Sequence, residues 1–146
     1  MAKFKYRMQN ILDIKMKLES QAKIAYSAAN QKYQEEQKKL QEIMIRRAGY
    51  EKALKESMTG TIDVRQIARA KSDVNAIKNI MRQQMMEVHK AERVLNDARN
   101  ALNEVMKERK THEKLKEKAF EQFKEELKAE ESKEIDQLVS FTYNDK

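Results

Sequence analysis

The near-absence of helix-breaking residues is the feature that most limits how this chain can fold. Its 146 residues include no proline and only two glycines, the residues that most strongly interrupt a helical pattern. One of them, Gly60, can adopt the positive φ with which many helices end. Asp63 follows as a good N-cap, with Gln66 three residues later as in a capping box. The sequence therefore predicts a helix, a tight turn near residue 60 and a second helix.

Composition favours a thin core between two helices over a thick globular core. Charged residues make up 38% of the chain, and the aromatic residues are five Tyr, four Phe and no Trp. The abundant Lys, Glu, Gln, Ala, Leu and Met are strong helix formers. The absence of cysteine excludes disulfides and thiolate metal sites. No apolar run is long enough for a membrane span, and no signal peptide is evident, so we expect a cytoplasmic protein.

The second half of the chain carries apolar residues at heptad spacing. From Val74 to Val105, two interleaved series of core positions are apolar except at Gln84, which is typical of a coiled coil. One series is Val74, Met81, Val88, Leu95, Leu102, Arg109, Lys116 and Phe123; the other is Ile77, Gln84, Ala91, Ala98, Val105, His112, Ala119 and Glu126.

The first half carries a less regular apolar stripe. It consists of Phe4, Met8, Ile11, Leu18, Ala22, Ala25, Tyr26, Ala29, Tyr33, Leu40, Ile43, Tyr50, Leu54 and Met58, with polar Glu36 and Arg47 at two core positions. The step from Ala22 to Tyr26 is four residues where three are due, which predicts a stutter in the heptads. Gly49 has no turn residues beside it, so we expect it to stay helical, at a cost of about 1 kcal/mol relative to Ala.

Together these patterns predict an all-α fold: a long antiparallel two-helix coiled coil, or helical hairpin, whose second helix overhangs the first. We expect helix 1 over about residues 4–58, a turn over about 59–62, helix 2 over about 63–138, and a disordered tail over 139–146. Reversal at Gly60 pairs residue i with roughly residue 121 − i, which places Arg109 opposite Ile11 or Met8. The overhang, about residues 118–138, has no first helix to cover its apolar side chains, so it either frays or binds another protein.

No arrangement of catalytic or cofactor-binding residues is evident. Catalysis requires groups that converge in a pocket, and two helices alone enclose none. His89 and His112 lie far apart, and the sequence lacks a glycine-rich phosphate loop, a Ser/His/Asp arrangement and zinc-ligand spacing. We therefore expect a non-enzymatic protein with no cofactor, no metal and no small-molecule substrate.

Charge leaves other functions open. Residues 1–58 carry 13 Lys and Arg against 7 Asp and Glu, residues 59–118 carry 14 against 9, and residues 119–146 carry 4 against 8. Because the basic residues are interleaved with acidic ones and form no recognised motif, we do not expect nucleic-acid binding. A basic nucleic-acid-associated helical protein, a membrane-surface role for the N-terminus and a scaffolding coiled coil are the alternative interpretations.

The first fifteen residues carry a resemblance to a known family. The segment Phe4-x-Tyr6-Arg7-Met8-x-x-Ile11-Leu12-x-Ile14-Lys15, leading into a helix rich in Ala, Glu and Gln, resembles the start of FliJ-family flagellar export proteins, with Met8 where Leu is commoner. The resemblance implies a component of the flagellar type III export apparatus, located in the cytoplasm and peripherally associated with the inner membrane. Such proteins are similar in shape to the central stalk of rotary ATPases.

The resemblance also implies partners and contact residues. The partners would be the hexameric export ATPase, the cytoplasmic domain of the export gate, and export chaperones. Candidate ATPase contacts are Phe4, Arg7, Ile11, Phe120, Phe123, Leu127 and Ile135. Candidate gate contacts are Gln37, Tyr50, Ile77 and Met81. Phe4, Ile11, Tyr50, Ile77 and Met81 also fit core positions, so packing is the alternative role of each.

Overall fold

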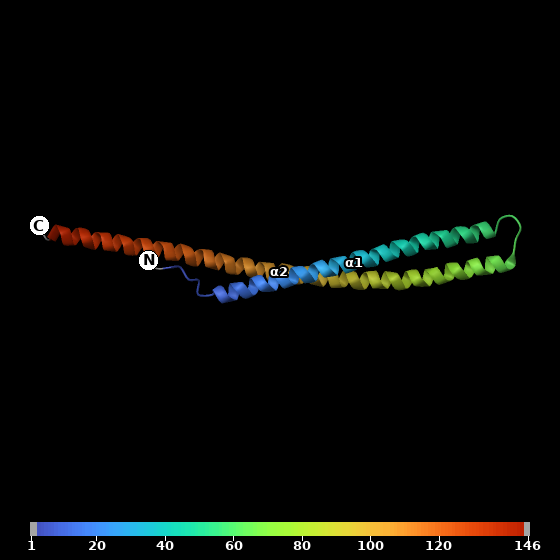
Figure 1. Cartoon of the computed structure of the whole chain (residues 1–146), viewed down its shortest axis with the longest axis horizontal. Coiled ribbons are helices and arrows are strands. Elements are labelled where there is room, and N and C mark those ends of the chain that lie inside the picture. Colours follow the sequence, from blue (N-terminus) through green and yellow to red (C-terminus); the bar gives the residue numbers. More distant parts are fainter. Residues whose placement is uncertain (1–2, 145–146) are drawn as a thin grey trace. The chain divides into compact units, whose positions relative to one another are not determined.

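The structure, a computed structural model, describes residues 3–144 and contains two helices. Helix α1 spans Gln9–Ser57 and helix α2 spans Val64–Asn144, and no strand occurs among these residues. The chain divides into two compact units: unit 1 runs up to Gln21 and resumes at Asn103, and unit 2 is Ala22–Leu102. In each unit a part of α1 lies antiparallel to a part of α2 (Figure 1). The predicted helical hairpin is confirmed.

Both helices differ from their predicted bounds at the end remote from the turn. Residues 3–8 are not helical, whereas helix 1 was expected from about residue 4. A non-helical chain rises about twice as far per residue as a helix, and in this segment Phe4 reaches α2. Helix α2 continues through residues 139–144, where the sequence predicted a disordered tail, because no Gly or Pro interrupts it. Residues 145 and 146 lie outside the described part.

The turn in unit 2 uses the predicted residues. Gly60 has a φ of 76°, and it is the one described residue in this left-handed region. The helix-ending bond runs from the Thr59 amide to the Glu56 carbonyl (3.1 Å). Asp63 is the N-cap of α2, since its carboxylate accepts a hydrogen bond from the Arg65 amide at 3.0 Å. This bond goes to the second helical residue and not to Gln66, so Asp63 caps α2 without the predicted capping box.

Helix α2 confirms the predicted heptads as far as Phe123. Every predicted core position from Val74 to Phe123 is buried or half-buried. The fully buried ones are Val74, Ile77, Ala91 and Leu95, each 6% exposed or less. The prediction fails at Glu126, which is exposed, whereas Leu127 is half-buried. The regular heptad burial therefore ends near the last residue that Phe4 contacts, Phe123.

Helix α1 corrects the predicted core, mainly before Ala22. Met8, Ala25 and Met58 were predicted core positions and are exposed. Ile11 and Leu18 are exposed by 37% and 40%, whereas Leu12 and Glu19 are buried. Lys15 is half-buried, so unit 1 uses positions 12, 15 and 19. These positions continue the three–four spacing that unit 2 shows at 22, 26, 29, 33 and 36. The predicted stutter is therefore wrong, because it was inferred from apolar residues alone and one core position here is occupied by the carboxylate of Glu19.

Several large apolar side chains lie outside the core positions. In unit 2, Ile24 and Ile45 are exposed by 72% and 73%, and single exposed apolar residues of this kind are normal on protein surfaces. Over the residues described, neither helix contains an apolar stretch that could cross a membrane.

Candidate functional site

Unit 1 contains an aromatic contact between the N-terminal segment and α2. The Phe4 ring lies 5.1 Å from the Phe120 ring and 5.5 Å from the Phe123 ring, centroid to centroid, and is tilted against both. The ammonium group of Lys124 lies 4.5 Å from the centroid of Phe120. Tilted aromatic pairs at these distances are stabilising beyond the area they bury. Three of the predicted ATPase contacts are thus brought together, and Phe4 covers the start of the predicted overhang.

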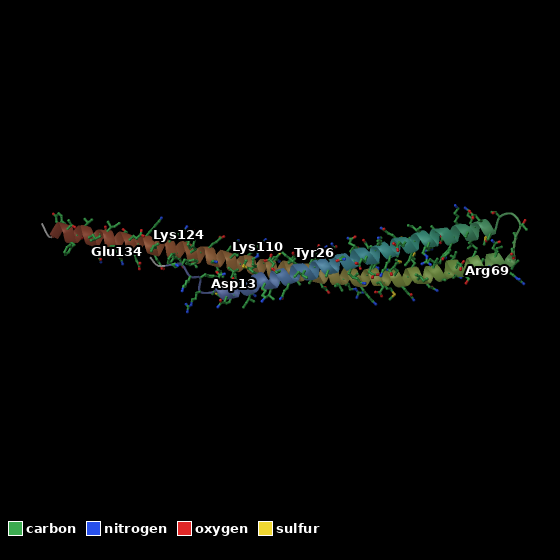
Figure 2. All side chains as sticks on the ribbon, viewed as in Figure 1. Asp13, Tyr26, Arg69, Lys110, Lys124 and Glu134 are labelled. Atoms are coloured by element: carbon green, nitrogen blue, oxygen red, sulfur yellow. The ribbon has the colours of Figure 1, made fainter. Side chains whose placement is uncertain are left out.

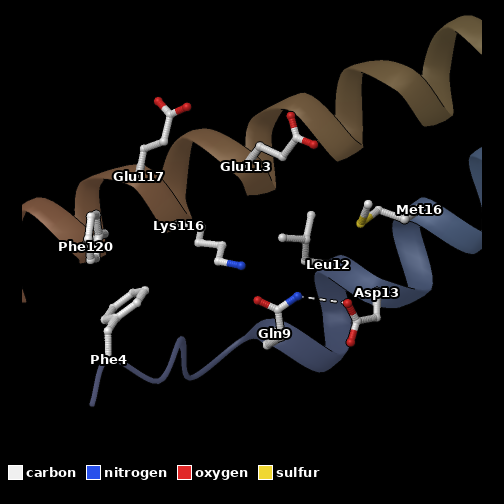
Figure 3. A pocket seen from close by; sticks show the side chains of 9 residues that line it. All are labelled: Phe4, Gln9, Leu12, Asp13, Met16, Glu113, Lys116, Glu117 and Phe120. Carbon is white, nitrogen blue, oxygen red and sulfur yellow. Dashed lines mark hydrogen bonds between the residues drawn. The ribbon is translucent and has the colours of Figure 1, made fainter. Parts of the chain in front are cut away.

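A groove opens beside this contact (Figure 3). Its apolar side chains come from both sides, with Phe4, Leu12 and Met16 facing Phe120 of α2. Lys116 extends into the space between them. Gln9 donates a hydrogen bond to the Asp13 carboxylate at 2.8 Å. The full lining is Phe4, Gln9, Leu12, Asp13, Met16, Glu113, Lys116, Glu117 and Phe120. The groove can accept an apolar side chain of a partner; among the described residues, no cluster of His, Cys, Asp or Glu could hold a metal ion.

Ion pairs connect α1 and α2 in unit 1 next to the groove. Arg109 donates from Nε and Nη2 to the two carboxylate oxygens of Glu19, at 2.5 and 3.3 Å, and from Nη1 to Glu113 at 2.8 Å. The hydrogen bond to Glu19 is the main cause that raises the pKa of Arg109. Lys15 lies 2.7 Å from Glu108 and lowers the pKa of that carboxyl by hydrogen bonding. These contacts place Arg109 opposite Glu19 rather than opposite Ile11 or Met8 as predicted.

Beyond Leu127, α2 carries apolar side chains that no other described part of unit 1 covers. Ile135 is 60% exposed, Leu138 65% and Phe141 69%. Figures 1 and 2 show this end of α2, where Glu134 is labelled, without another segment beside it. Large apolar side chains exposed along one helix face mark an interaction surface. Of the other predicted ATPase contacts, Arg7 and Ile11 are exposed and Leu127 is half-buried.

The four predicted gate contacts lie in unit 2 and differ in how accessible their side chains are. Ile77 is 1% exposed, so its side chain packs in the core. Gln37 donates to the Tyr33 hydroxyl at 2.7 Å, and Nη1 of Arg47 lies 3.6 Å from the Met81 sulfur. Gln37, Met81 and Tyr50 are half-buried, so each retains some surface that a partner could contact.

A polar cluster in unit 2 was only partly foreseen. Glu36, assigned to a core position from its spacing, is 4% exposed. Gln84 donates to its carboxylate at 2.6 Å and to its backbone carbonyl at 2.9 Å, and Lys32 lies 2.8 Å from the carboxylate. The hydrogen bonds from Lys32 and Gln84 lower the pKa of Glu36 to about 2. The buried Glu19 was missed, although its place seven residues before Tyr26 was a usable signal.

Comparison with known proteins gives one match. The family model described as "Flagellar FliJ protein" matches residues 4–146, nearly the whole chain. No curated protein and no solved structure gives a significant match.

Proposed function

Because the chain belongs to the FliJ family and is therefore a component of the flagellar export apparatus, we propose that it acts as the stalk-like subunit of the export ATPase. It would bind the hexameric ATPase through the N-terminal segment and the uncovered end of α2. Membership of a non-catalytic family fits the expectation that it is not an enzyme. Its location would be the cytoplasm, with peripheral association to the inner membrane at the export apparatus.

The observation that carries this proposal is the uncovered apolar end of α2. Ile135, Leu138 and Phe141 are each at least 60% exposed, and burying them against a partner would release the free energy that drives most protein association. An amphipathic helix laid into an apolar groove is a recurring recognition mode. The protein would bias the nucleotide sites of the ring through binding energy, without contributing a catalytic group.

The remaining partners belong to the same proposal. The cytoplasmic domain of the export gate would contact unit 2 near Gln37, Tyr50 and Met81, whose side chains are partly accessible. Ile77 would support that surface from inside, because it is only 1% exposed. Export chaperones would use exposed positions of either unit.

The test compares two apolar pairs in the full chain. The variant Ile135→Ser/Leu138→Ser alters the uncovered end of α2, and Ile24→Ser/Ile45→Ser alters two isoleucines of unit 2 that are somewhat more exposed. The readouts are pull-down with the purified export ATPase and stimulation of its turnover. We expect the first pair to lose both and the second to retain them. If the Ile135→Ser/Leu138→Ser variant still stimulates ATPase turnover, the end of α2 is not part of the contact.

The salt dependence of binding distinguishes a nucleic-acid-binding role from the proposed stalk role. Phosphate contacts produce retention on nucleic acid that falls steeply as salt rises. If the wild-type chain shows such retention and no ATPase stimulation, the stalk proposal fails. If the chain shows neither retention on nucleic acid nor ATPase stimulation, a scaffolding coiled coil is the remaining interpretation.

A further inference from the structure

One face of α2 in unit 1 carries six large apolar residues, here called the α2 stripe. With 3.6 residues per turn, its members fall within an arc of about 120° around the helix axis. Phe4 covers only the first two members, and exposure rises to 69% at the last. The α2 stripe consists of Phe120, Phe123, Leu127, Ile135, Leu138 and Phe141.

Two carboxylates interrupt the α2 stripe at its centre. Glu131 and Glu134 lie between Leu127 and Ile135, and the same helical geometry places both inside the apolar arc. Glu125 and Asp136 project from the opposite face. All four are exposed, and within the described residues neither Glu131 nor Glu134 forms an ion pair. A partner that buries the α2 stripe must therefore also cover these two charges.

Electrostatics decides what such a partner must present. A carboxylate moved into an apolar groove without a cation is strongly unfavourable, whereas one that meets Arg or Lys can add specificity. Residues 119–146 carry 4 basic against 8 acidic residues, unlike the basic remainder of the chain. This end of the molecule therefore attracts a basic surface and turns away from an acidic one.

We propose that the α2 stripe docks into an apolar groove of the export ATPase whose wall carries basic side chains facing Glu131 and Glu134. The inference rests on the proposed function and names the chemistry of the surface that receives α2. Apolar contacts supply the attraction, and the two ion pairs set the rotation of the helix in the groove. If the helix were rotated by half a turn about its own axis, it would bury Glu125 and Asp136 and would leave the α2 stripe exposed to water.

The experiment reverses charge on one face at a time in the full-length chain. The variant Glu131→Lys/Glu134→Lys is compared with the matched Glu125→Lys/Asp136→Lys, which changes net charge by the same amount on the opposite face. Glu and Lys are both good helix formers, and circular dichroism checks that helix content is unchanged. Affinity for the purified ATPase hexamer is measured by calorimetry from low to high salt. We expect the first variant to bind about tenfold or more weakly and the control to change by about twofold or less.

The outcomes separate the inference from the proposed function. If the wild-type chain binds the ATPase and both variants lose affinity equally, only net charge matters and the inference is overturned. It is also overturned if neither variant loses affinity, or if sedimentation shows that the α2 stripe pairs two copies of this chain. If the wild-type chain does not bind the ATPase, the proposed function fails, and the inference fails with it. A face-specific loss that weakens as salt rises supports it.

Discussion

Arg109 of α2 holds Glu19 of α1 in unit 1 through two hydrogen bonds, from Nε to Oε2 and from Nη2 to Oε1. The Glu19 residue is only 6% exposed, and it occupies a core position that an apolar side chain would normally fill. A buried carboxylate of this kind is tolerated only while its cation is present.

Removing one partner of this pair should cost more stability than replacing both. Arg109→Ala leaves Glu19 buried without its guanidinium, so we expect a clear fall in the urea midpoint. The double variant Glu19→Leu/Arg109→Leu removes both charges and fills the core, so we expect its midpoint to equal or exceed that of the wild type. Urea unfolding followed by circular dichroism measures both. A double variant as unstable as Arg109→Ala would contradict this account.

Stability should fall in acid through Glu36. Because its pKa is lowered in the folded state to about 2 from 4.5, the carboxylate contributes stability above pH 4.5, and this contribution is lost as the pH falls from 4.5 towards 2. Glu36→Gln should therefore be less stable than the wild type at pH 7 and lose less stability over that interval. Thermal unfolding between pH 7 and pH 2 measures the difference. Glu42→Gln, at an exposed position, is the control and should follow the wild type.

The main contribution of Ile77 should be to the stability of the fold and not to direct contact with a partner. Because its side chain is 1% exposed, Ile77→Ala should destabilise the protein by about 2–5 kcal/mol. The exposed Ile24→Ala should change the free energy of unfolding by only about 0.5 kcal/mol or less. Both are measured by urea unfolding. An Ile77→Ala variant of unchanged stability would show that this residue is not in the core.

The two glycines should respond oppositely to alanine. Gly49 lies inside α1 with nothing within 4 Å of an added Cβ, so Gly49→Ala should stabilise the protein by about 0.5–1 kcal/mol. Gly60 has equal space but a φ of 76°, so Gly60→Ala should destabilise it by about 1–2 kcal/mol. Thermal and urea unfolding provide the measurement. Equal effects would show that conformation does not distinguish the two positions.

Much of the fold follows from local features of the sequence. The near-absence of Gly and Pro leaves one turn, and Gly60 and Asp63 locate it. The α2 core from Val74 to Phe123 was predicted because its positions are mostly apolar and regularly spaced. Periodicity suffices there because most positions are apolar, and the few polar ones, such as Gln84 and His112, fall on the same regular spacing.

The buried positions of the N-terminal part of α1 became clear only with the tertiary structure. There Ile11 and Leu18 are more apolar than Lys15 and Glu19, yet Glu19 occupies the core and Leu18 does not. The choice depends on Arg109, which is ninety residues away in sequence and adjacent in space.

The sequence by itself thus determined the helices, their reversal and the family to which the chain belongs. Only the tertiary structure decided that Arg109 is the partner of the buried Glu19, and how far Phe4 covers α2. The physical reason is that a buried carboxylate is strongly unfavourable without a cation beside it, and the fold supplies that cation.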